Sequence, residues 1–112
     1  MSKLEESPIR VKSFQFAVEI VNFCDTLKKN KDFELASQLI RSGTSIGANT
    51  REAQRGFSKK DFKYKFSIAL KEADETKFWL EILEATGRKV PNEMKNKCEE
   101  LIRILVAINK NS

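Results

Sequence analysis

The chain has 112 residues, of which 33% are charged and 40% hydrophobic, with a net charge of +5 and no histidine. This length suits a single domain with a modest core, and the missing histidine excludes Ser-His, Cys-His and Glu-x-x-His chemistry. Only four glycines and two prolines interrupt a sequence rich in helix formers, so we expect an all-α protein.

The N-terminal residues lack the apolar segment of a signal peptide. No apolar run approaches the roughly 20 residues that a membrane-spanning helix needs. We therefore expect a soluble cytoplasmic protein. Cys24 and Cys98 both fall on apolar helix faces, where we expect them to be buried and reduced.

The first helix is expected over residues 8–29, because Ser7 can cap it and Pro8 is tolerated in its first turn. Its apolar face is unusually broad and comprises Phe14, Phe16, Ala17, Ile20, Val21, Phe23, Cys24 and Leu27. Residues 30–32 should form a turn, with Asp32 available to cap the second helix.

The second helix is expected over residues 33–55, and its 3.6-residue period separates two faces. The apolar face contains Leu35, Leu39, Gly43, Ile46, Thr50 and Ala53. The opposite face should carry one basic stripe formed by Arg41, Thr44, Ala48, Arg51 and Arg55.

Two glycines inside this helix, Gly43 and Gly47, would each cost about 1 kcal/mol relative to alanine. Close approach of another helix is the natural reason for keeping them. Ser42, Ser45 and Asn49 lie beside the apolar face, and we expect them to satisfy one another at a helix contact rather than to bind a ligand.

The third helix is expected over residues 59–86, with Ser58 as its cap and Gly87 as its stop. One apolar face contains Phe62, Phe66, Ala69, Ala73 and Leu80. A second strip lies nearly opposite and contains Tyr64, Ile68, Phe78, Trp79 and Ile82. The second strip favours a contact between subunits; the alternative is that the third helix is simply central in the bundle. For Phe78 and Trp79 we expect packing or an interface role rather than stacking on nucleobases.

The fourth helix, over residues 92–109, has the clearest apolar repeat, formed by Met94, Cys98, Leu101, Leu105 and Ile108. It should close the bundle against the first helix. Short connections between successive long helices predict an up-down-up-down antiparallel four-helix bundle.

Charge is concentrated in residues 41–65, which hold seven lysines or arginines against two acids. In the rest of the chain the basic and acidic residues are equal in number. A basic surface of this kind can bind phosphates, although such residues are often only solvated. The candidate nucleic-acid-binding residues are Arg41, Arg51, Arg55, Lys59, Lys60 and Lys63.

No catalytic or metal site is expected. Glu72, Asp74 and Glu75 could in principle hold a cation, but their spacing on a helix and the nearby lysines favour surface pairing. The glycines do not form a phosphate-binding loop. We therefore expect a non-enzymatic protein without a cofactor.

The run from Gln38 to Asn49 (QLIRSGTSIGAN), followed by Glu52-Ala53, residues 58–62 (SKKDF) and residues 66–69 (FSIA), resembles a known family. It is similar to the bacterial four-helix bundle proteins named after intervening sequences of 23S ribosomal RNA genes. The family commonly reads Asn-Ile-Ala-Glu-Gly where this chain has residues 49–53, NTREA. The departure adds the charge of Arg51.

This resemblance implies assembly into a ring, usually a homopentamer. It also implies kinship with the accessory variability protein of diversity-generating retroelements, in which a basic ring surface engages nucleic acid and a reverse transcriptase. The leading hypothesis is an oligomer that binds structured RNA or DNA through phosphates with low sequence specificity. The alternative is a scaffold that docks an acidic protein, such as a reverse transcriptase, without touching nucleic acid.

Overall fold

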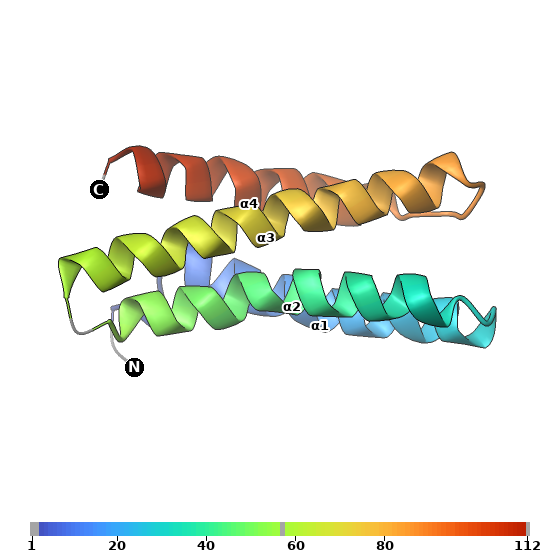
Figure 1. The fold of residues 1–112 in the computed structure, drawn as a ribbon, viewed down its shortest axis with the longest axis horizontal. Coiled ribbons are helices and arrows are strands. Elements are labelled where there is room, and N and C mark those ends of the chain that lie inside the picture. Colours follow the sequence, from blue (N-terminus) through green and yellow to red (C-terminus); the bar gives the residue numbers. More distant parts are fainter. Residues whose placement is uncertain (1–2, 57, 112) are drawn as a thin grey trace.

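A computed structural model of the protein describes residues 3–56 and 58–111. The described chain forms four helices, α1 (Pro8–Lys29), α2 (Phe33–Gln54), α3 (Lys59–Ala85) and α4 (Asn92–Lys110). Successive helices run in opposite directions along the long axis (Figure 1). The chain is therefore an all-α, up-down-up-down four-helix bundle, as predicted.

Local signals explain most helix ends. The Ser7 hydroxyl accepts a hydrogen bond from the Arg10 backbone N–H, and the Ser58 hydroxyl accepts one from Asp61. Beyond α3, Gly87 has a φ of 88°, the left-handed conformation that favours glycine after a helix. Phe57, which the sequence places beside the end of α2, lies outside the described residues.

The predicted cap of α2 is wrong. Asp32 occupies the N-cap position, but its carboxylate makes no capping hydrogen bond. It instead accepts two hydrogen bonds of 2.8 Å from the guanidinium of Arg88, in the α3–α4 connection. Hydrogen bonding to Arg88 lowers the pKa of Asp32. The side chain therefore ties two turns together at one end of the bundle.

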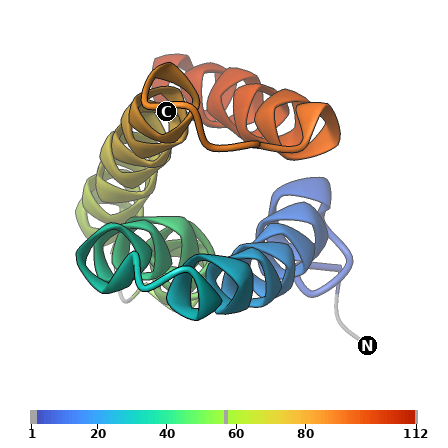
Figure 2. The same ribbon diagram turned by 90° about the vertical axis from the view of Figure 1, so that its right-hand side faces the viewer.

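Each helix packs against its two neighbours around a single apolar core (Figure 2). The largest fully buried side chains include Phe16, Ile20, Leu39 and Leu80. Cys24 and Cys98 are also buried as free thiols, and burial raises their pKa values to about 11 and about 12.

The seam between α1 and α4 is closed partly by charge. Lys12 of α1 pairs with Glu100 of α4 at 2.6 Å, and Lys97 of α4 pairs with Glu19 of α1 at 2.8 Å. These residues line a small hollow between the two helices. Helix α4 thus closes the bundle against α1, as the sequence predicts.

The two glycines of α2 lie where α1 comes close. A Cβ atom on Gly43 would lie 2.9 Å from Cγ2 of Ile20, and one on Gly47 would lie 3.3 Å from the Ser13 carbonyl oxygen. No larger residue fits these positions without a shift of α1.

The polar residues beside the glycines do not satisfy one another, in contrast to the prediction. Ser45 and Asn49 donate to the carbonyl oxygens of Arg41 and Ser45, at 2.5 and 2.8 Å. Ser42 donates similarly to Leu39. All three groups therefore use carbonyls of their own helix, which the preceding turn always offers to a short polar side chain.

Candidate nucleic-acid interface

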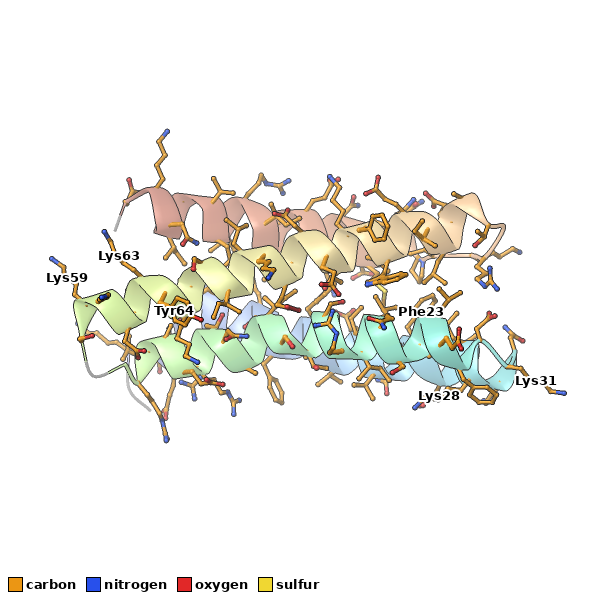
Figure 3. The ribbon with its side chains drawn as sticks, viewed as in Figure 1. Phe23, Lys28, Lys31, Lys59, Lys63 and Tyr64 are labelled. Carbon is orange, nitrogen blue, oxygen red and sulfur yellow. The ribbon has the colours of Figure 1, made fainter. Side chains whose placement is uncertain are left out.

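Three lysines of α3 form the centre of the candidate interface. Lys59, Lys60 and Lys63 are exposed in the first two turns of α3. Figure 3 shows Lys59 and Lys63 at the end of the bundle where α2 joins α3. Within residues 3–56 and 58–111, no carboxylate forms an ion pair with any of the three. Their charge is therefore free to meet an anion.

Arg55 belongs to the same end, because it is the exposed C-cap residue of α2. Lys65, two residues after Lys63 on α3, is instead paired with Glu52 of α2 at 2.8 Å. The hydrogen bond that Lys65 donates to Glu52 raises the pKa of Lys65. This pair holds α2 and α3 together. Lys65 therefore does not add an unpaired charge to Arg55 and the three lysines.

Arg41 lies apart from this surface. Its guanidinium pairs with Glu72 at 3.1 Å and also with Glu75, both on α3. Glu75 in turn accepts a hydrogen bond from the indole N–H of Trp79. Two of the three acids that the sequence suggested as a cluster, Glu72 and Glu75, are thus partners of Arg41, whereas Asp74 is not. No group of metal-binding side chains occurs among the described residues.

Arg51 points toward α1 instead. Its guanidinium carbon lies 5.2 Å from the centre of the Phe14 ring, a cation–π contact. Arg41 faces α3 and Arg51 faces α1, so the arginines of α2 do not form the single stripe that the sequence predicted. The 3.6-residue period located their common side of α2 but could not show that neighbouring helices flank it.

The second strip of α3 is divided as well. Trp79 packs against the core and borders a hollow lined by Glu34, Leu35 and Gln38 of α2. Ile68 and Ile82 are half-buried. Tyr64 and Phe78 remain exposed, at 61% and 53%. Within this strip, only these two rings project clearly into solvent.

A larger apolar surface lies on α1, where the sequence shows an unusually broad apolar face. Phe14 and Val21 are exposed rather than buried, because Phe16, Ile20 and Cys24 already fill the core side. The exposed side chains recur at i, i+3, i+7 and i+10, and we call them the α1 strip. They are Val11, Phe14, Val18 and Val21. The spacing was readable in the sequence, but it did not show which half of the broad face would be covered.

The opposite end of the bundle carries a second group of exposed lysines, Lys28, Lys29 and Lys31. Figure 3 shows Lys28 and Lys31 far from Lys59 and Lys63. None of the three forms an ion pair with another described residue. Unlike the α3 lysines, they lie at and beyond the C-terminus of a helix, where the backbone dipole is negative.

Comparison with known proteins places this geometry in a family. The model of the 23S rRNA-intervening sequence protein family matches residues 5–107. The chain belongs to this family. A solved structure from Bacteroides thetaiotaomicron, described as a protein of unknown function from the S23 ribosomal protein family, is 44% identical, with a TM-score of 0.85. The similarity covers 91% of this chain and 95% of that one.

No curated protein matches this member of the 23S rRNA-intervening sequence protein family. The structure adds that none of its described helices is both long and apolar enough to cross a membrane.

Proposed function

We propose that this family member is a non-enzymatic, self-associating bundle that binds RNA or DNA through the phosphate backbone. The observation that carries the proposal is the unpaired group Lys59, Lys60 and Lys63, adjoining Arg55 at one end of the molecule. We call this group of four the basic end.

The position of these lysines favours an anionic ligand for a second reason. Lys59 and Lys60 occupy the first turn of α3, where the unsatisfied backbone N–H groups give the helix a partial positive charge. The charges of Lys59 and Lys60 and the dipole of α3 therefore both make this end positive. At the C-terminus of α1, by contrast, the negative end of the helix dipole offsets part of the charge of Lys28 and Lys29. Asp61 reduces the local charge without cancelling it.

This surface supports recognition of phosphates rather than of base sequence. Lysine ammonium groups are flexible point charges without the planar fork that arginine uses to read guanine. A ligand that neutralises three or four cations releases its own counterions, so affinity should fall steeply with salt. We expect similar binding to different sequences of the same structure.

Self-association is supported by the α1 strip, and we propose a second copy of the chain as its occupant. Its four side chains are 39–53% exposed along one helix. Monomeric proteins rarely leave such a contiguous apolar surface open to water. Assembly would repeat the basic end once per subunit, so that weak sites act together on one polymer.

The test is the salt dependence of binding to a labelled RNA hairpin and a DNA duplex, followed by fluorescence anisotropy. If four phosphates are neutralised per subunit, the logarithm of the affinity should fall against the logarithm of salt with a slope of about −3 to −4. No binding at about 50 mM salt would contradict the proposal. If the protein binds neither nucleic acid but retains an acidic protein, the result would support the adaptor function instead.

A further inference from the structure

Tyr64 is an exposed aromatic ring next to the basic end. It lies in the second turn of α3 and is 61% exposed. No other described residue makes a ring contact with it. Figure 3 shows it close to Lys63, at the same end of the helix.

The neighbouring cations lie on the same side of α3 as the ring. Lys60 and Lys71 are four residues before and seven residues after Tyr64, which places all three within about 40° around the helix axis. Both lysines are exposed, and neither pairs with a described carboxylate. The three side chains span about 16 Å of helix at 1.5 Å per residue.

The other exposed aromatic rings of the described chain lie in different surroundings. Phe78 stands between Asp74 and Glu81 on the same helix, and Phe33 stands between Asp32 and Glu34. Asp32 is paired with Arg88, but Glu34, Asp74 and Glu81 form no ion pair with a described residue and would repel phosphates. Phe14 is exposed, but its face is occupied by Arg51. Among the exposed rings described, Tyr64 alone combines an open face with two lysines on its side of the helix, and Asp61, three residues earlier, offsets only part of their charge.

We propose that Tyr64 is a stacking platform for an unpaired nucleobase, so that the basic end prefers single-stranded segments of nucleic acid. The inference rests on the proposed function and specifies its ligand. Lys60 and Lys71 hold the phosphates on either side, while the ring stacks on the base between them. Stacking of this kind tolerates any base, because every base has a π-face. A continuous duplex hides those faces.

A preference for single-stranded over duplex nucleic acid is the opposite of what charge alone would produce. A duplex carries a higher density of phosphates than a single strand, so a purely electrostatic surface binds the duplex at least as well. Tighter binding to the single strand therefore requires a contact that only unpaired bases offer.

The experiment compares a labelled oligouridylate of about 15 nucleotides with an RNA duplex of equal length, within the range of single-strand site sizes. The wild-type protein is expected to bind the single strand more tightly. Tyr64→Ala should weaken single-strand binding at least about fivefold and leave duplex binding unchanged, whereas Tyr64→Phe should retain wild-type affinity. Equal loss on both ligands, or no loss, would overturn the inference.

A direct readout is available because the chain contains one tyrosine. Incorporation of 3-fluorotyrosine gives a single fluorine resonance, which should shift on addition of the single strand and stay in place with the duplex. A shifted resonance with both ligands would remove the stacking role.

Two outcomes separate this inference from the proposed function. If the wild-type protein binds both ligands equally and Tyr64→Ala is silent, the stacking role fails while phosphate binding stands. If it binds neither, both fail. A change in the native mass of Tyr64→Ala would make Tyr64 a subunit contact and would likewise overturn the stacking role.

Discussion

Gly43 of α2 lies directly against Ile20 of α1. A Cβ atom at position 43 would be 2.9 Å from Cγ2 and 3.0 Å from Cγ1 of Ile20, which is itself fully buried. The contact sets the distance between the two helices. It also positions Arg51, eight residues further along α2, over Phe14.

Gly43→Ala should therefore destabilise the protein. Helix propensity favours alanine by about 1 kcal/mol, whereas overpacking of a filled core costs about 1–3 kcal/mol. We expect a net loss of about 1 kcal/mol, measured by urea unfolding. Ala48→Gly on the exposed side of α2 calibrates propensity alone, with an expected loss of about 1 kcal/mol. An alanine variant more stable than wild type would show that α1 moves away freely.

The Asp32–Arg88 pair should make stability depend on pH. Because the pair lowers the pKa of Asp32, its contribution is complete above the ordinary value of 3.8 and is lost as the pH falls through the lowered one. Asp32→Asn should be less stable than wild type at neutral pH. Urea unfolding at a series of pH values should show the two proteins converging below about pH 4. A constant difference down to low pH would exclude the pair as its source.

The α1 strip should hold subunits together. Val18→Asp places a charge at the centre of the strip. Because Val18 is 45% exposed, the substitution should cost the folded subunit little stability. Native mass spectrometry should give an oligomer for wild type and a smaller species for this variant, with unchanged circular dichroism. Val106→Asp, at an equally exposed valine on α4, is the matched control and should remain assembled. A monomeric wild type, or equal behaviour of both variants, would remove the strip from the assembly.

The helices could be predicted closely because local residues determine their ends. Ser7 with Pro8, Ser58 and Gly87 act within one turn, so each predicted end lies within one residue of the observed one. The buried face of α2 could be predicted for the same reason, because the apolar repeat that defines it depends only on the residues of that helix.

The pairings between helices could not be predicted in this way. Arg41 meets Glu72 from 31 positions away, and Asp32 meets Arg88 from 56. A carboxylate takes a bidentate guanidinium in preference to a single backbone N–H when the fold supplies one. The sequence therefore located the basic residues of the candidate site but could not separate the arginines engaged by neighbouring helices from the unpaired lysines.

The most direct test of the central proposal compares charge reversal at the two ends of the bundle. One variant carries Lys59→Glu, Lys60→Glu and Lys63→Glu, and the other carries Lys28→Glu, Lys29→Glu and Lys31→Glu, so both change the net charge equally. Affinity for a labelled RNA hairpin is measured at one salt concentration, after circular dichroism confirms that both variants fold. We predict at least about tenfold weaker binding for the first variant and a much smaller change for the second. Equal losses at both ends, or no loss at either, would contradict a nucleic-acid interface at the basic end.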